Sequence, residues 1–286
     1  MRGMTNMRKV GVALCLAGLV AGAMTAVEPA RAESLTIGAA YSLKPAFQEL
    51  VPLFEGEYGA TVRVVYGPSQ TLRRDIEQGA AIDVFLPAAA EEIEKLQKKG
   101  LTVGESPRIY GQTSLVLVMS ATSRATPVSF RDVGLNRAFR IALGDPKTSG
   151  LGDLTARLLT QVEPTYKSRF HPIYARHSEE MVDLIQHGAA DAGILYRVDA
   201  ISNGQVRIID ENPFGVHRPV YFGQAVVSTC RTESRAVAEE FLDFMTSPRI
   251  QKLLLKYGFE SMSAMGGEEG IKLADRKYET MDVLNE

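Results

Sequence analysis

The sequence predicts an α/β protein with mostly parallel sheets. Short apolar stretches of strand length alternate with amphipathic stretches of helical period along most of the chain. Gly, Pro and Ser mark the junctions, and the continuous apolar run 114–119 is typical of a strand buried on both faces. These three observations favour strand–helix units over an all-helical or an all-β fold.

The first half of the chain begins with a strand expected over 35–38. The helix that Ser42 opens then places Phe47, Leu50 and Phe54 on one face. Gly and Pro separate the later stretches, so each is expected to form its own element. These elements are expected at 61–65, 70–78, 82–85, 91–99 and 114–119.

The second half repeats the alternation. Ser178 is expected to cap a helix that ends at Gly188. Ser247 as N-cap, Pro248 at the first position and Gly258 beyond the end delimit the last helix. The other elements of this half are expected at 139–144, 152–162, 173–176, 192–197, 206–209, 220–228 and 233–246.

The N-terminus has the order of a secretory signal peptide. Basic residues precede an apolar run over 10–26, and Ala30-Arg31-Ala32 stands before Glu33. The run is short for a membrane span, so cleavage after Ala32 and release into a periplasm is favoured over a retained anchor. We therefore expect 1–32 to be a signal peptide, and the polar segment 263–286 to be a weakly ordered tail.

Charge and motifs exclude several classes of function. The 32 Lys+Arg and 34 Asp+Glu nearly balance, which argues against nucleic acid and membrane surfaces as partners. No pair of histidines has metal-ligand spacing, and no nucleophile elbow, Walker loop or dinucleotide-binding fingerprint occurs. The sequence thus predicts a protein that is not an enzyme and that needs no cofactor.

Several strand–helix junctions favour an anion site. Ser42, Ser69 and Ser178 each stand at an expected N-cap, and a fourth junction spans 147–151. Helix N-termini present unpaired N–H groups and a partial positive charge, and ligands gather at the carboxyl ends of parallel strands. The alternative is that each serine is only a helix cap, because spacing alone cannot show that the junctions converge.

A set of short motifs in one order resembles the periplasmic molybdate-binding proteins of ABC transporters. The motifs are Ala39-Ala40-Tyr41-Ser42-Leu43, Ser69-Gln70-Thr71-Leu72, Asp83-Val84-Phe85-Leu86-Pro87-Ala88, Gly144-Asp145-Pro146, Gly193-Ile194-Leu195-Tyr196-Arg197-Val198-Asp199-Ala200 and Lys256-Tyr257-Gly258-Phe259. The resemblance implies a two-lobed type II periplasmic-binding-protein fold with a cleft and two hinge crossovers, near 111–115 and 221–225. One lobe would comprise 33–114 and 224–262, and the other 115–223.

The resemblance also implies the site. Ser42 and Ser69 match family serines that donate hydroxyl and backbone hydrogen bonds, and Tyr196 matches the family tyrosine. Leu151 and Ser178 fall where the family offers backbone N–H groups. These five residues would hold molybdate or tungstate as a whole oxyanion, with no bond from a side chain to the metal. The implied protein is a monomer that hands the anion to a membrane permease.

Other ligands stay open. Tyr41 and Leu151 are larger than the residues usual at their positions, which keeps sulfate, thiosulfate or another oxyanion as an alternative. An anion-sensing partner of a receptor, or an enzyme on the same scaffold, would need other evidence. Of the five residues expected around the anion, only the tyrosine is titratable. Without a carboxylate to accept a hydrogen bond from a protonated ligand oxygen, such a site favours fully deprotonated anions over hydrogen phosphate.

Overall fold

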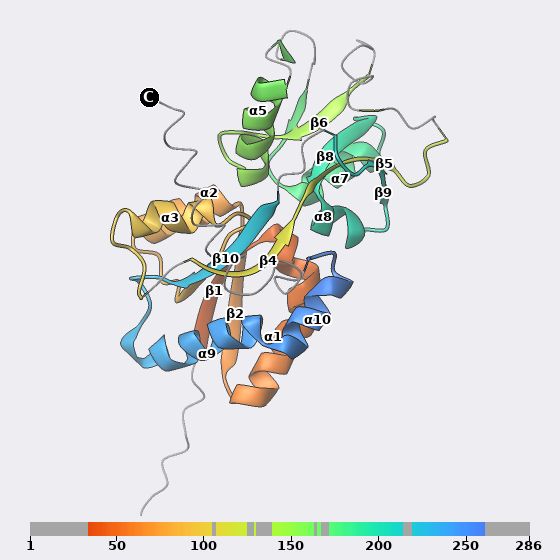
Figure 1. Cartoon of the computed structure of the whole chain (residues 1–286). Helices are drawn as coiled ribbons and strands as arrows, with labels where there is room; N and C mark the ends of the chain where they lie inside the picture. The colour runs from red at the N-terminus through yellow and green to blue at the C-terminus, as the bar shows by residue number, and fades with distance from the viewer. Residues whose placement is uncertain are drawn as a thin grey trace, which may run out of the picture. The chain divides into compact units, whose positions relative to one another are not determined.

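The structure, a computed structural model, describes residues 34–104, 107–124, 129, 139–162, 165–166, 172–213 and 219–260. These residues form two five-stranded sheets, each with its own helices (Figure 1). We call the sheet that contains the first strand, with its helices, lobe 1, and the other sheet with its helices lobe 2. The expected signal peptide and C-terminal tail lie outside the described residues.

Lobe 1 has the strand order β2-β1-β3-β10-β4. The first three strands run parallel, whereas β10 is antiparallel to both β3 and β4. The strands are β1 (Ser34–Ala40), β2 (Thr61–Gly67), β3 (Val84–Leu86), β4 (Arg108–Thr113) and β10 (Val220–Val226).

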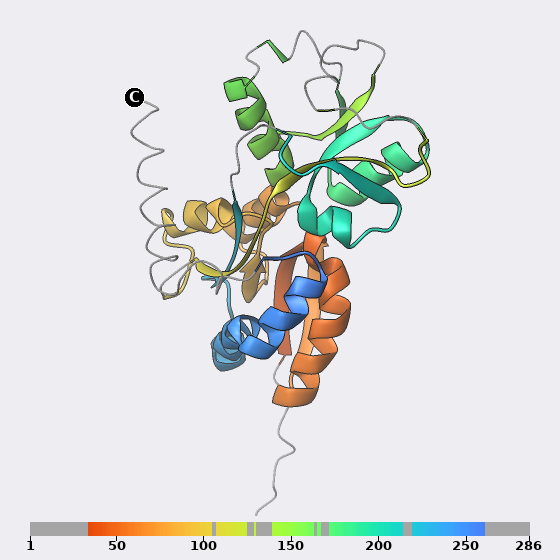
Figure 2. The ribbon, with the colours of Figure 1, turned by 45° about the vertical axis from the view of Figure 1, so that its right-hand side comes forward.

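Helices cover both faces of this sheet. Side chains alternate along β3, so that Val84 and Leu86 belong to the main core while Phe85 packs in a second cluster with Leu72 and Ile93. The helices α1, α9 and α10 lie beside one another, away from α2 and α3 (Figure 2). Their bounds are η1 (Tyr41–Leu43), α1 (Lys44–Tyr58), α2 (Ser69–Glu77), α3 (Glu91–Gln97), η2 (Thr232–Ser234), α9 (Arg235–Thr246) and α10 (Pro248–Lys256).

Lobe 2 repeats the arrangement with the strand order β7-β6-β8-β5-β9. Strands β6, β7 and β8 are parallel, and β5 is antiparallel to its neighbours β8 and β9. The helices α5 and α7 pack against the sheet, and the short α8 contacts β5, β8 and β9. The elements are β5 (Leu115–Ser120), β6 (Ile141–Gly144), α5 (Gly150–Val162), β7 (Ile173–Ala175), α7 (Ser178–Gln186), β8 (Ala192–Tyr196), α8 (Arg197–Ile201) and β9 (Val206–Asp210).

The expected fold class is confirmed, but the sheets are mixed rather than mostly parallel. Each sheet combines two parallel with two antiparallel pairings. Sequence reasoning missed β4, whose polar and glycine-containing sequence has no strand pattern, and α8, which is too short to show a helical period. The chain passes from the first sheet to the second at Ser114, between β4 and β5, and β10 belongs to lobe 1 over its whole length.

The apolar face expected for the first helix and the bounds expected for the last helix agree with the structure. Phe47, Leu50 and Phe54 are buried on α1, which continues through Pro52. The last helix begins at Pro248 as expected, and Gly258 beyond its end has a φ of 83°, a left-handed conformation that favours glycine. Among the described residues, no helix combines the length and the apolar character needed to cross a bilayer.

Candidate functional site

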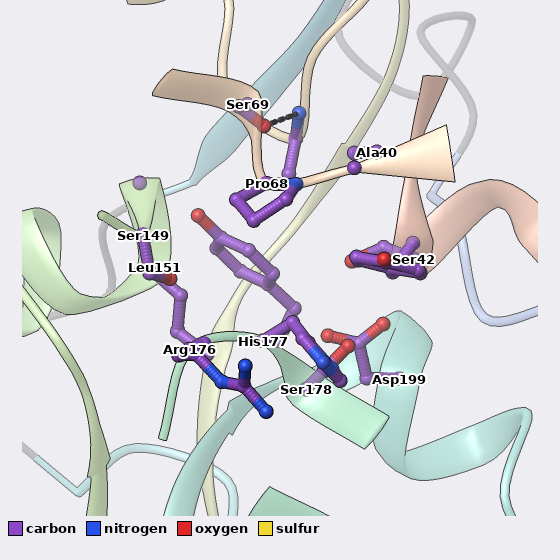
Figure 3. Close-up of a pocket in the computed structure, with 15 residues that line it drawn as sticks. Ala40, Ser42, Pro68, Ser69, Ser149, Leu151, Arg176, His177, Ser178 and Asp199 are labelled. Atoms are coloured by element: carbon purple, nitrogen blue, oxygen red, sulfur yellow. Dashed lines mark hydrogen bonds between the residues drawn. The ribbon is translucent and has the colours of Figure 1, made fainter. Parts of the chain in front are cut away.

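All five predicted ligand residues line one cavity. They come from both lobes and follow the carboxyl ends of parallel strands: η1 follows β1, α2 follows β2, α5 follows β6 and α7 follows β7. Figure 3 shows Ser42 and Ser69 on one side of the cavity, and Leu151 and Ser178 on the other. The complete lining is Ala40, Tyr41, Ser42, Gly67, Pro68, Ser69, Ala88, Ser149, Gly150, Leu151, Arg176, His177, Ser178, Tyr196 and Asp199.

The size of this cavity limits its ligand. Its volume is about 30 Å³, and a single water needs about 10–15 Å³ measured in the same way. Pockets for larger organic ligands are roughly ten times as large or more. The cavity therefore suits an anion of a few heavy atoms, and not a sugar, an amino acid or a peptide.

Ser42 and Ser69 stand in the first turns of their helices rather than at the N-caps. Ser42 lies in η1, and α2 begins at Ser69 with Pro68 as N-cap. The expectation that these serines cap their helices is therefore wrong, and their hydroxyls are not used on their own helix. The Ser69 hydroxyl oxygen accepts from the Ala88 N–H at 3.0 Å, which leaves its proton for another acceptor.

Leu151 offers a backbone N–H from the start of α5. The first turn of a helix has N–H groups without partners inside the helix, and the N-terminus carries partial positive charge. Two glycines bring this turn close to β6, because a Cβ on Gly152 would lie 2.5 Å from the carbonyl of Gly144. The Ser149 hydroxyl accepts from the Gly152 N–H at 3.3 Å and supports the same turn.

Ser178 is the first residue of α7, and His177 is the N-cap. The His177 Nδ1 accepts from the Glu180 N–H at 3.2 Å, so the expected capping role belongs to the histidine. Its ring lies 4.5 Å from the ring of Tyr41, measured between centroids. This contact joins the two lobes beside the cavity. Because His177 caps the helix, the Ser178 hydroxyl is not needed there and acts on Asp199 instead.

Tyr196 ends β8 and is buried, with 2% of its surface exposed. Its hydroxyl finds no hydrogen-bond partner within the described part of the chain. It lies beside the start of α5, since a Cβ on Gly150 would be 3.9 Å from the hydroxyl oxygen. Burial raises the pKa of Tyr196 well above its usual value, so the O–H stays a donor at neutral pH.

Sequence reasoning missed three charged or titratable residues of this cavity: Asp199, Arg176 and His177. The expectation of a shell that is neutral apart from the tyrosine is therefore wrong. Asp199 is 8% exposed, and burial raises its pKa to about 7, an effect that the hydroxyls of Ser42 and Ser178 partly offset. A signal existed, because Asp199 follows Tyr196 by three residues, the spacing of one helical turn.

Arg176 contributes a positive charge at the rim. Its side chain is 72% exposed and pairs with Glu180, whose pKa is lowered first of all by the backbone N–H of Arg176. Within the described ranges, no group of three or more His, Cys, Asp or Glu side chains is placed to hold a metal ion.

Ion pairs also join the lobes around the cavity. Lys44 on α1 pairs with Glu179 on α7 at 2.9 Å, and Arg157 on α5 pairs with Glu91 on α3 at 2.7 Å. These side chains are between 28% and 45% exposed, so each pair contributes little by itself. Both pairs connect a helix of lobe 1 with a helix of lobe 2.

Comparison with known proteins identifies the family. Residues 35–260 match the family of bacterial extracellular solute-binding proteins. The chain belongs to this family. Such solute-binding proteins are not enzymes, in agreement with the sequence prediction.

Named relatives place this solute-binding protein with ABC transporters. A putative ABC transporter substrate-binding lipoprotein of Bacillus subtilis, YvgL, is 30% identical over 79% of this chain and 86% of its own. The molybdate-binding protein ModA of Haemophilus influenzae is 26% identical over 90% of this chain and all of its own. A ligand and a membrane transporter are therefore its expected kinds of partner.

A solved structure supports the two-lobed fold. The sulfate-binding protein SubI of Mycobacterium tuberculosis has a TM-score of 0.72 and 20% identity, covering 85% of this chain and 91% of SubI. At this identity the likeness concerns the fold alone. The resemblance to molybdate-binding proteins seen in the motifs is confirmed by the ModA relative over nearly the whole chain.

Proposed function

We propose that this solute-binding protein captures molybdate or tungstate between its lobes and delivers it to an ABC transporter. The observation that carries the proposal is the convergence of the five predicted residues on one cavity of about 30 Å³. A relative that is 26% identical over 90% of the chain is a molybdate-binding protein, which supports the same ligand.

The donors of the cavity suit a tetrahedral dianion. The first turns of α2, α5 and α7 offer N–H groups, and Ser42, Ser69 and Tyr196 offer hydroxyls. Hydrogen bonds from neutral donors to an anion contribute about 1.5–3 kcal/mol each. The buried Tyr196 hydroxyl, which has no partner within the described residues, is a donor that an oxyanion would satisfy.

Delivery follows from the two-lobed arrangement. An anion that bonds to both lobes stabilises the state in which they are closed, and a transporter can recognise that state. We propose a monomer exported by a signal peptide over 1–32 and released into the periplasm. In the domain organisation we propose, 33–114 and the chain from β10 to 262 form one lobe, the residues between them form the other, and 263–286 follow as a tail. We place the return to the first lobe, expected at 224, at the start of β10, because β10 pairs with β3 and β4 over its whole length.

Sulfate or thiosulfate is the second candidate ligand. Tyr41 and Leu151, the two bulky departures from the family pattern, both line the cavity. Sulfate and molybdate have the same charge and accept similar numbers of hydrogen bonds, so the size of the cavity must distinguish them. Bulky side chains at these two positions make the cavity smaller and so favour the smaller anion. Phosphate also belongs among the test ligands, because Asp199 can accept a hydrogen bond from a protonated oxyanion.

Thermal unfolding with single anions tests the ligand class. A ligand at 100 times its dissociation constant stabilises the folded state by about 2.7 kcal/mol, which raises the midpoint by a few degrees. We expect molybdate and tungstate to raise it more than sulfate, thiosulfate or phosphate. A larger shift with sulfate would select the second candidate, and no shift with any oxyanion would contradict both.

Ser42→Ala tests the site itself. Loss of one hydroxyl donor should weaken molybdate binding by roughly tenfold or more in calorimetry. Ser228→Ala is the matched control, because Ser228 is exposed and lies outside the cavity. Equal affinities for the two variants would place the ligand elsewhere.

A further inference from the structure

Asp199 is a buried carboxyl in the lining of the candidate site, and the proposed hydrogen-bond donors give it no role. Within the described part of the chain, no other carboxyl lines this cavity. Asp199 lies on α8, in the turn that follows Tyr196. Figure 3 shows its carboxyl group directed toward Ser42, with Ser178 beside it.

The surroundings of this carboxyl join both lobes. The hydroxyls of Ser42, from lobe 1, and Ser178, from lobe 2, act on its charge. Its Oδ2 is buried and has no hydrogen-bond partner among the described residues. On its other side Asp199 also lines a second cavity of about 80 Å³, together with Glu179 and Asn203. The carboxyl therefore borders both the anion cavity and this second cavity.

Few charged groups face Asp199. Tyr41 on η1, Glu179 on α7, and Arg176 and His177 before α7 line the same cavities, and Tyr196 precedes it on β8. Lys44 on α1 is paired with Glu179. Of the strands that contact α8, β5 carries no charged side chain and β9 carries Arg207 and Asp210.

The charges close to Asp199 determine whether its carboxyl is protonated. After burial, Glu179 is the neighbouring charge that raises the pKa of Asp199, and the effects that lower it come from the hydroxyls of Ser42 and Ser178. A dianion placed in the cavity adds a second, stronger repulsion at close range in a medium of low dielectric constant. Protonation removes that repulsion and converts an acceptor-only carboxylate into a donor for an anion oxygen.

We propose that the site takes up one proton together with its anion, and that Asp199 holds that proton. The inference rests on the proposed capture of an oxyanion in this cavity. Since the pKa of Asp199 is already raised to about 7, mainly by burial, the anion raises it further and the proton is taken from solvent at slightly alkaline pH. Affinity then falls as pH rises, which makes release easier on the alkaline side.

Calorimetry with molybdate and with sulfate tests this inference on the purified protein. Both anions stay fully deprotonated over the range of about pH 6.5–9, so the ligands contribute no proton step. Titrations at each pH in two buffers of different ionisation enthalpy count the protons taken up. We expect close to one proton per anion near pH 8, and a dissociation constant that rises by up to about tenfold per pH unit above about 7.

Asp199→Asn tests the role of the carboxyl directly, because an asparagine side chain has the same shape as aspartate but cannot take up a proton. It should bind without proton uptake and with an affinity independent of pH. Asp183→Asn on the exposed face of α7 is the control and should keep the wild-type dependence on pH. A purely structural role for Asp199 would lower affinity by the same factor at every pH.

Three outcomes would overturn the inference. One is binding by the wild-type protein with no proton uptake, a result that does not depend on any variant. Another is an unchanged pH dependence in Asp199→Asn, which would assign the proton to another group. In both cases an oxyanion still binds, so the proposed function stands. If no oxyanion binds at any pH, the proposed function and this inference fail together.

Discussion

Single residues of the site are buried polar groups, and one of them has no hydrogen-bond partner among the described residues. Ser42, Ser69 and Tyr196 are at most 8% exposed, and the Tyr196 hydroxyl has no partner in the described structure. A buried donor without a partner costs stability, so its presence in a cavity indicates a ligand group that completes it. The motifs predicted these residues. They did not single out Asp199: its spacing of three residues from Tyr196 is visible in the sequence, but the burial of its carboxyl in the cavity appears only in the folded chain.

Tyr196→Phe separates stability from binding. Removing a buried hydroxyl without a partner should leave the free energy of unfolding unchanged, or raise it by up to about 1 kcal/mol. Molybdate affinity should fall by about ten- to a hundredfold, because a charge-assisted hydrogen bond is lost. Tyr110→Phe is the control, since the Tyr110 hydroxyl is also buried without a partner but lies outside the cavity. A comparable loss of affinity in both variants would contradict the assignment.

Asp199 should make the stability of the anion-free protein depend on pH. Its carboxyl has a pKa of about 7 in the folded chain and about 3.8 in the unfolded chain. The folded state therefore binds the proton more tightly, and the stabilisation present at low pH is lost as pH rises toward 7. Between pH 5 and pH 8 the loss is about 2–3 kcal/mol. Urea unfolding of Asp199→Asn should lack this part of the pH dependence, and identical profiles for both proteins would contradict it.

At the scale of elements, the cavity depends on helices that begin at the carboxyl ends of strands. The approach of α5 to β6 is the tightest of these junctions, because both Gly144 and Gly152 have backbone atoms where a Cβ would stand. This closeness positions the N–H groups of the first turn of α5, including that of Leu151. The sequence predicted the strand and the helix, whereas the contact between their backbones appears only in the folded chain.

Gly152→Ala should disturb this junction. The added Cβ would lie 2.5 Å from backbone atoms of Gly144, so α5 must move away from β6. We expect a loss of about 1–3 kcal/mol in the free energy of unfolding, together with weaker molybdate binding in calorimetry. Gly56→Ala is the control: its Cβ would have open space within α1, and it should stabilise by about 0.5–1 kcal/mol. Normal affinity in Gly152→Ala would show that this turn does not bind the anion.

At the scale of the whole molecule, three contacts around the cavity join the two lobes, in addition to apolar packing such as that of Tyr196 against Phe222. The pairs Lys44–Glu179 and Arg157–Glu91 and the ring contact of Tyr41 with His177 all connect different lobes. Each of these three contacts is weak, so a ligand that binds to both lobes would add substantially to what holds them together. This is the property that a carrier needs in order to load and release a solute.

Glu91→Gln tests how far these pairs favour closure. An exposed ion pair contributes up to about 1 kcal/mol, so molybdate affinity should fall by at most about fivefold at low ionic strength. The difference should vanish at high salt, where exposed charges are screened. Glu57→Gln breaks the Arg249–Glu57 pair inside lobe 1 and should leave affinity unchanged. A fall of the same size in both variants would show that the pair between lobes has no special role.

The sequence by itself determined the α/β class, most of the elements and the five residues of the candidate site. These features depend on local periodicity, on helix-start signals and on ordered motifs, all of which are visible along the chain. Only the tertiary structure decided the mixed sheets, the pairing of β4 with β10, and the position of Asp199 beside Ser42 and Ser178. These features depend on contacts between residues far apart in the sequence. Burial in such contacts is what changes the charge state of a carboxyl, and it acts only once both lobes have folded around it.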